Sequence, residues 1–285
     1  MRKPPRTPSS EPAELAALRQ LRGRQPELAA AVDLQIELLA LQRRVEARLS
    51  TPWLDVDQEG VRARTCAGRP LIRFQDIPFE WTEYRLLFRQ IADVLRRFDL
   101  LEADDYANIQ RLVRSGRPDE TDVSAWYSEE PGESPDGSGS NGPTGDAFVQ
   151  VLELAARPFL ARIVATTAGR VDLSAWRLTR CPFCGGAPEL AVRRSADEGL
   201  LACARCAGLW AFDVRACIHC GNTDDSLLGS FASQDGLYRL TTCDVCRRYS
   251  KTYDVSQGAR PLMLPVDAIA TLPLDAAAQK SGYRP

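Results

Sequence analysis

Four Cys-x-x-Cys pairs between residues 181 and 246 constrain this chain more than any other feature, because they hold eight of its nine cysteines. The pairs are Cys181/Cys184, Cys203/Cys206, Cys217/Cys220 and Cys243/Cys246. Two thiolates three positions apart on a tight turn can face one ion, and two such turns make the tetrahedral four-sulfur site that zinc or iron prefers. The pairs therefore predict metal binding, and thiolates alone do not distinguish iron from zinc.

The lengths between the pairs indicate how they combine. Eighteen residues separate the first pair from the second, and 22 separate the third from the fourth, which is enough for a β-hairpin in each case. Only ten residues separate the second pair from the third, so this stretch is a connector. We predict two successive ribbons with one ion each. The expected ligands are Cys181, Cys184, Cys203 and Cys206 for the first ion, and Cys217, Cys220, Cys243 and Cys246 for the second.

Other interpretations of the paired cysteines have less support. A thioredoxin-like redox pair needs a strand before it and a helix after it, whereas small residues follow three of the pairs: Gly185, Ala207 and Gly221. Such residues tolerate the positive φ that turns backbone N–H groups toward the sulfurs of a metal site. Arg247 follows the fourth pair, so the geometry of that turn stays open. We expect no disulfides, because the sequence shows no secretory signal and few other cysteines.

Candidates for catalysis are few. Cys66 stands alone, and we interpret it as a small buried or surface residue. The single histidine, His219, lies inside the third cysteine pair, so a nucleophilic triad would have to be built among metal ligands. We therefore predict no catalytic residues.

The charge balance excludes some partners. With 36 Lys and Arg against 38 Asp and Glu, the net charge is −2, which gives no global attraction to nucleic acid or anionic lipid. No apolar run approaches the ~20 residues of a membrane helix. The basic start of the chain has no apolar stretch behind it, so we expect no membrane span and a cytoplasmic location.

The hydrophobic pattern predicts an α+β fold. Apolar residues recur at helical spacing before the cysteines and alternate as in strands among them. We expect an N-terminal all-helical domain followed by two small metal-binding β domains. The expected segments are a disordered tail over 1–10, a helical domain over 11–176 with a flexible insert over 116–146, a first ribbon over 177–214, a second over 215–262, and a C-terminal tail with a short helix over 263–285.

Some details of this organisation are open to test. Pro158 should kink or split its helix. Trp126 and Tyr127 are expected to anchor one end of the insert, and the stretch 51–80 should hold turns and extended pieces. The predicted helices lie over 11–49, 83–98, about 103–114, 147–168 and 267–274.

Further residues in the region 176–285 complete a recognisable pattern. They are Cys181-Pro182-x-Cys184-Gly185-x-x-Pro188, Cys203-x-x-Cys206-x-x-x-Trp210, Cys217-x-x-Cys220, Cys243-x-x-Cys246 with Tyr249 and Lys251, Val266-Asp267-x-Ile269-Ala270-x-Leu272-x-Leu274-Asp275-Ala276, and Gly282-Tyr283. This pattern resembles the formate dehydrogenase accessory protein FdhE family. The N-terminal helices resemble that family only in kind, and the insert near 130–145 looks peculiar to this sequence.

The resemblance implies a specific fold and role. The implied fold is a helical domain followed by two tandem rubredoxin-like, zinc-ribbon-type domains, with all eight paired cysteines as ligands of two metal ions, iron or zinc. The implied role is that of a cytoplasmic protein, not itself an enzyme, needed for maturation of respiratory formate dehydrogenase. Its implied partner is the catalytic subunit, bound before export. The sequence does not decide whether the protein forms a homo-oligomer.

Two other functions stay open at this point. Four sulfurs around iron make a one-electron centre, so the chain could be an iron–thiolate electron-transfer protein. It could also be a nucleic-acid-binding zinc ribbon. Residues 177–262 hold 11 Lys and Arg against 9 Asp and Glu, which is too balanced for a surface that follows phosphates, so we expect no nucleic acid.

Overall fold

The structure is a computed structural model. It describes residues 12–50, 54, 57–128, 145–195, 198–213, 215–258 and 260–285. The predicted tail over 1–10, residues 51–53 and residues 129–144 of the insert predicted over 116–146 lie outside the described residues.

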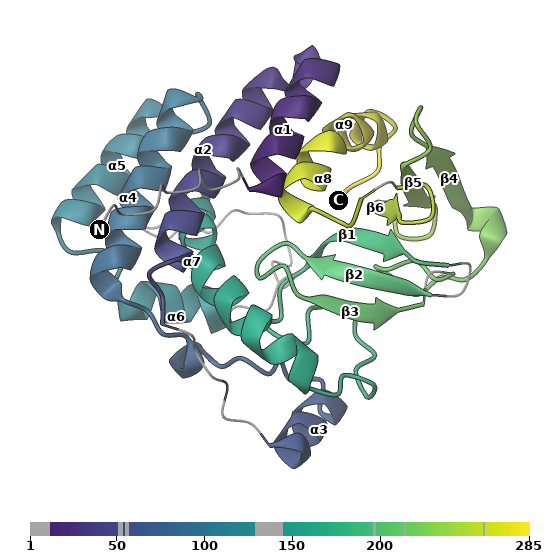
Figure 1. Ribbon diagram of the computed structural model, residues 1–285, viewed down its shortest axis with the longest axis horizontal. Helices are drawn as coiled ribbons and strands as arrows, with labels where there is room; N and C mark the ends of the chain where they lie inside the picture. Colours follow the sequence, from purple (N-terminus) through teal and green to yellow (C-terminus); the bar gives the residue numbers. More distant parts are fainter. Residues whose placement is uncertain are drawn as a thin grey trace, which may run out of the picture.

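Seven α-helices precede the cysteines in the described part of the chain (Figure 1). They are α1 (Ala13–Arg24), α2 (Ala29–Glu46), α3 (Gln58–Cys66), α4 (Trp81–Arg97), α5 (Ala103–Arg114), α6 (Glu120–Ser128) and α7 (Asp146–Thr167). The core of this part joins α2, α4 and α7, with aromatic contacts such as Tyr84 against Phe159 at 5.8 Å between ring centroids.

The single helix predicted over 11–49 is wrong. Gln25 leaves the helical region with φ −129° and ψ 77°, and a short 3₁₀ turn (Pro26–Leu28) follows. Because proline lacks an N–H, Pro26 begins a new helix and cannot continue α1. The two helices pack against each other, and Leu18 of α1 lies in a cluster with Val32 and Leu39 of α2.

Two helices lie where turns or a loop were predicted. The first is α3, whose N-cap Asp57 accepts a hydrogen bond from the Gly60 N–H at 2.7 Å. The second is α6, which begins inside the predicted insert. Trp126 of α6 is buried and belongs to the main core, so the prediction that it anchors one end of the insert is confirmed.

Proline does not split the last helix of this region. α7 runs unbroken from Asp146 to Thr167 with Pro158 inside it. Proline in a helix interior costs about 3 kcal/mol. Ten other residues of α7 are buried on the two sides of Pro158, and that packing outweighs the lost hydrogen bond.

The cysteine region forms one six-stranded sheet with the strand order β3-β2-β1-β6-β5-β4. The strands are β1 (Pro188–Arg193), β2 (Gly199–Cys203), β3 (Leu209–Phe212), β4 (Leu228–Ala232), β5 (Tyr238–Cys243) and β6 (Arg248–Asp254). The predicted hairpins are present within each ribbon. The two ribbons do not form separate sheets, however, because β1 pairs in parallel with β6 from Ala191/Thr252 to Arg193/Asp254.

The C-terminal segment packs over the sheet and touches the helices. Two helices, α8 (Leu264–Ala270) and α9 (Leu272–Lys280), replace the single short helix that was predicted. α8 contacts α1, α2 and β1, and Val266 is buried with Leu18 and Val32. α9 contacts β5 (Figure 1). The C-terminal segment therefore joins the helical part to the ribbons. Among the described residues, no helix is both long and apolar enough to cross a membrane.

Candidate metal centres

Eight cysteine sulfurs gather into two groups of four. Within each group the sulfurs lie within 4.8 Å of one another. The first cluster is Cys181, Cys184, Cys203 and Cys206, and the second is Cys217, Cys220, Cys243 and Cys246. The spacing argument therefore predicted the grouping correctly, and each group could hold a metal ion.

Each Cys-x-x-Cys turn has the same backbone form. The residue after the second cysteine has positive φ in all four turns, and its N–H donates to the carbonyl of the first cysteine at 2.9–3.1 Å. These residues are Gly185, Ala207, Gly221 and Arg247, with φ of 76°, 57°, 72° and 56°. The fourth turn thus keeps the shared geometry without a glycine.

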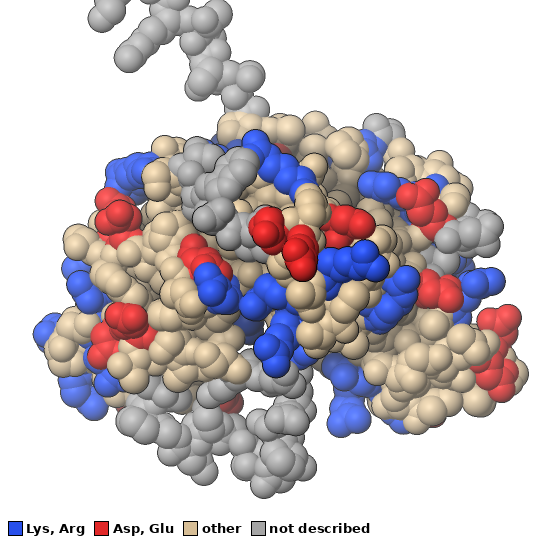
Figure 2. Space-filling view, turned by 90° about the horizontal axis from the view of Figure 1, so that it is seen from below, with Lys and Arg blue, Asp and Glu red and all other residues tan. Residues whose placement is uncertain are grey.

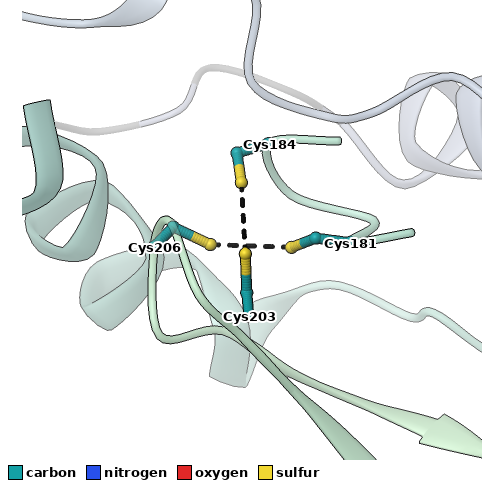
Figure 3. A group of neighbouring side chains, drawn as sticks. All are labelled: Cys181, Cys184, Cys203 and Cys206. Atoms are coloured by element: carbon teal, nitrogen blue, oxygen red, sulfur yellow. Dashed lines mark hydrogen bonds between the residues drawn. The ribbon is translucent and has the colours of Figure 1, made fainter. Parts of the chain in front are cut away.

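The sulfur spacing fits a tetrahedral ion. Four sulfurs at about 2.3 Å from a central ion would lie about 3.8 Å from one another. In the first cluster, Cys181 Sγ lies 3.5 Å from Cys206 Sγ, and Cys184 Sγ lies 3.5 Å from Cys203 Sγ (Figure 3). The corresponding distances in the second cluster are 3.8 Å for Cys217–Cys246 and 3.7 Å for Cys220–Cys243. Small shifts would accommodate the ion at either site.

The electrostatics of the first cluster favour a bound cation. Burial raises the pKa of the Cys184 and Cys206 thiols well above the usual range. Hydrogen bonds from the neighbouring thiols lower the pKa of Cys203, whose sulfur also accepts the Arg205 N–H at 3.3 Å. Four buried thiolates this close would repel one another without a positive ion between them. The donor set therefore fits a metal ion that neutralises the four sulfurs.

The second cluster is more open to solvent. Cys217 and Cys243 are buried, Cys246 is partly exposed and Cys220 is exposed. Burial raises the pKa of Cys217 to about 12. At Cys243, burial also raises the pKa, but hydrogen bonds from the N–H groups of Cys246 and Val245 and from nearby thiols outweigh it and lower the pKa to about 7.

The first turn of the first cluster is attached directly to the helical part. The N–H groups of Leu71 and Ile72 donate to the carbonyls of Pro182 and Phe183, both at 2.8 Å. Phe183 is fully buried in the main core. The apolar and aromatic side chains of residues 70–79 predict a loop held against the core by its aromatics, and Phe74 and Phe79 do pack against it. The contact of this loop with the cysteine turn is not predictable from the sequence.

Arginines surround the first cluster. A hollow of about 380 Å³ beside Cys184 is lined by Arg64, Arg73, Arg180 and Arg205, and no Asp or Glu among the described residues lines it. Arg73 pairs with Asp76, which lies outside the lining, at 2.7 Å. A divalent ion in four thiolates carries a net charge of about −2, so these guanidinium groups offset it.

The C-terminal residues hold the fourth turn. The Arg247 guanidinium stacks on Tyr283 at 4.3 Å and donates to Asp244 at 2.8 Å, and the Tyr283 hydroxyl donates to the same carboxylate at 2.7 Å. The Arg284 N–H donates to the Arg247 carbonyl at 2.9 Å. These contacts stabilise a turn that lacks the glycine of its counterparts.

Several polar residues of the sequence pattern tie the C-terminal helices to the ribbons. Lys251 is buried and donates to Asp275 of α9 at 2.9 Å and to Glu189 of β1 at 3.2 Å. The Tyr249 hydroxyl donates to the other oxygen of Asp275 at 2.8 Å. Asp267 of α8 is fully buried and accepts the Tyr238 hydroxyl at 2.6 Å. These residues hold the second ribbon, α8 and α9 together.

Neither of the two remaining candidates joins a cluster. Cys66 is exposed at the end of α3. His219 Nε2 lies 2.8 Å from the Tyr249 carbonyl oxygen, and the His219 N–H donates to Cys217 Sγ at 3.5 Å. Its ring therefore helps to position the third turn.

The surface carries both signs of charge. Figure 2 shows basic side chains gathered about the middle of one face with acidic side chains beside them. The electrostatic potential over this face is therefore not of a single sign.

Known proteins similar to this chain are FdhE proteins. No family model matches the sequence. A protein FdhE homolog of Aquifex aeolicus is 22% identical over 266 residues, which is 90% of this chain and 87% of that protein. A protein FdhE homolog of Shewanella oneidensis is 32% identical over 107 residues, or 36% of this chain and 35% of that protein. The crystal structure of the FdhE protein from Pseudomonas aeruginosa matches with a TM-score of 0.64 at 20% identity, covering 95% of this chain and 90% of that one.

Over most of its length the chain is similar to FdhE proteins. The match to the Aquifex aeolicus FdhE homolog covers most of both chains, so the helical part belongs to the likeness as well as the cysteine region. The likeness to the Pseudomonas aeruginosa FdhE structure confirms the predicted fold class, a helical N-terminal part followed by a β part with two four-cysteine clusters.

Proposed function

We propose that this protein is an accessory protein for the maturation of respiratory formate dehydrogenase, and that it binds the catalytic subunit in the cytoplasm before export. The observation that carries the proposal is the likeness to an FdhE homolog over 90% of the chain. The two four-cysteine clusters support it further. In this role the protein is a binding partner and not an enzyme.

The eight cysteines are proposed to hold two metal ions, iron or zinc. Cys181, Cys184, Cys203 and Cys206 would hold the first ion, and Cys217, Cys220, Cys243 and Cys246 the second. When bound, an ion supplies charge neutralisation and a tetrahedral cross-link between two turns. The chain itself provides N–H donors to sulfur, such as those of Arg205 and His219. Metal analysis of protein purified without air would identify the ions.

Co-purification tests the role. The tagged protein is mixed with the apo catalytic subunit from the same organism, and a deletion strain is assayed for formate dehydrogenase activity. We expect a complex that survives gel filtration and a loss of activity that the intact gene restores. Absence of a complex together with normal activity in the deletion strain would overturn the proposal.

A second candidate is one-electron transfer through iron. The exposure of Cys220 favours it, because an electron centre near the surface is accessible to a redox partner. The expected result is a visible iron–thiolate spectrum that bleaches with dithionite. Colourless protein that contains only zinc would refute this candidate and leave the accessory role intact.

A further inference from the structure

A pocket lies between the helical part and the first ribbon. Its volume is about 580 Å³, within the range of small-ligand and peptide sites. One wall is a face of α2 that includes Leu39 and Gln42, and another is the stretch of α7 around Pro158. The turn that contains Cys206 and the loop before α8 complete it. A molecule bound here would contact both parts of the protein and the edge of the first cluster.

The lining is mostly apolar, and four arginines and three glutamates interrupt it. Among these, Arg43 pairs with Glu14, Arg194 with Glu198, and Glu189 with Lys251. Side chains from α2, β2, β3 and the segment 262–265 provide the apolar surface. Arg157 and Arg205 also line the pocket, and the Nε of each is buried and has no hydrogen-bond partner among the described residues. Buried donors are almost always paired in native proteins, so two unpaired guanidinium donors in one pocket need an explanation.

Arg205 is held in place without a close ion pair. Its side chain is 10% exposed, its guanidinium stacks on Trp126 at 4.5 Å, and its Nε lies 4.0 Å from a Glu153 oxygen. That separation is too long for a hydrogen bond. Arg157 is half-buried, and no ion pair or hydrogen bond of its guanidinium occurs within the described ranges. A carboxylate in the pocket would supply the missing acceptor for these arginines.

Gln42 indicates the kind of molecule that fits. It is buried, and its Nε2 donates to the Leu154 carbonyl at 2.9 Å, which leaves its oxygen as an acceptor. A peptide N–H can donate to such an oxygen, whereas an alkyl chain cannot. Gln35 adds a second amide to the lining. The apolar surface, the amides and the unpaired arginines together match a short extended peptide with apolar side chains and one carboxylate.

We propose that this pocket binds a short apolar segment of the partner protein that carries one carboxylate. The proposal rests on the accessory role proposed above and names the surface of this chain that recognises the partner. The carboxylate pairs with Arg157 and Arg205, and the apolar side chains cover Leu39, Leu200 and Leu209. The helical part and the first ribbon then bind the partner together.

The decisive variant is Arg157→Met. Removing an unpaired buried donor should leave the melting temperature of the free protein unchanged or higher, because that donor is not hydrogen-bonded in the free state. The affinity for the catalytic subunit should fall by about tenfold or more, because a charge-assisted hydrogen bond is lost. Arg239→Gln is the matched control. Its guanidinium contacts Ser230 on the distant β4–β5 hairpin, so binding should be unchanged.

Isothermal titration with the catalytic subunit measures both affinities, and scanning calorimetry of the free variants measures stability. If the unmodified chain does not bind the subunit at all, the accessory role itself fails. If it binds and Arg157→Met binds equally well, only the pocket proposal is overturned. A fall in affinity that accompanies a lower melting temperature and lost metal would also overturn it, because it would assign Arg157 a structural role.

Photo-crosslinking provides an independent test that does not disturb the arginines. Benzoylphenylalanine replaces Ala161, which lines the pocket, or Ala232 on β4 as a control. We expect the Ala161 variant to crosslink to one segment of the catalytic subunit that contains an Asp, a Glu or the C-terminal carboxylate. Equal crosslinking from both positions, or crosslinking to a segment without a carboxylate, would contradict the proposal.

Discussion

The sulfurs of the first four-cysteine cluster lie in the hydrophobic core, whereas Cys220 of the second cluster is exposed and Cys246 is partly exposed. The turn geometry and the sulfur spacing are nevertheless nearly the same in both. Phe183 in the first turn is fully buried, and its counterpart in the third turn, His219, is only partly buried. One local motif is thus placed in two different environments.

Different segments of the chain hold the two clusters in place. Hydrogen bonds from Leu71 and Ile72 attach the first cluster to the helical part. Contacts with Tyr283 and Arg284 hold the second. An ion in the first cluster should therefore be coupled to folding of most of the chain. An ion in the second should affect the second ribbon and the C-terminal helices.

The largest expected difference concerns loss of a ligand. With its ion, a structural zinc site contributes about 10 kcal/mol or more. Cys203→Ser in the buried cluster should therefore prevent stable folding, because it leaves three buried thiols without an ion. Cys220→Ser should yield soluble protein with one ion fewer and intact helices. Soluble yield, circular dichroism and metal per chain measure the difference, and equal losses for the two variants would refute the comparison.

The next difference concerns the third residue of each turn. Phe183→Ala removes a fully buried ring and should lower the free energy of unfolding by about 3–5 kcal/mol. His219→Ala loses one hydrogen bond to the Tyr249 carbonyl and should cost about 1 kcal/mol. Urea unfolding of both variants tests this. A larger cost for His219→Ala would mean that the second cluster is the better packed of the two.

The sequence predicts the features that depend on residues close together in the chain. The grouping of the cysteines is predictable, because each turn is set by residues a few positions apart and each hairpin by the length between two turns. The contact of Leu71 with Pro182 and the pairing of β1 with β6 are not, since they join residues more than fifty positions apart. Such contacts cannot be predicted from the pattern of neighbouring residues in the sequence.

Errors in the helices have local physical causes. The residues Arg22-Gly23-Arg24-Gln25 before Pro26 carry no apolar side chain, so the helical pattern over 11–49 is interrupted there and Pro26 begins the next helical segment. α3 has only two buried residues, Val61 and Thr65, so it shows little periodicity. Pro158 caused the opposite error, because a break was predicted where the helix continues. Burial of α7 outweighs the tendency of proline to interrupt a helix.

Release of the ions should also differ between the clusters. A chelator can reach a sulfur–metal bond at Cys220 without unfolding of the core, so the second cluster should lose its ion at least about tenfold faster. When metal transfer to the chelator is followed by absorbance, we expect two phases of equal amplitude, one for each ion. The Cys220→Ser variant should lack the fast phase. A single phase that involves both ions would show that their release is coupled through the shared sheet.

The smallest expected effects concern the residue after each second cysteine. Gly185 has φ of 76°, and an added Cβ would lie 3.2 Å from Pro70 Cγ, so Gly185→Ala should cost about 1–2 kcal/mol. Gly169→Ala, where a Cβ would meet open space, is the control.

Arg247→Gly sets two opposing effects against each other at the fourth turn. Glycine relieves the strain of positive φ by about 1 kcal/mol, but the stacking on Tyr283, worth about 0.5–1 kcal/mol, is lost. Unfolding free energies of Arg247→Gly and the unmodified chain should therefore agree within about 1 kcal/mol. Arg247→Ala keeps the strain and loses the stacking, so it should be the less stable of the two variants. If Arg247→Ala were instead the more stable, the arginine would not hold this turn through Tyr283.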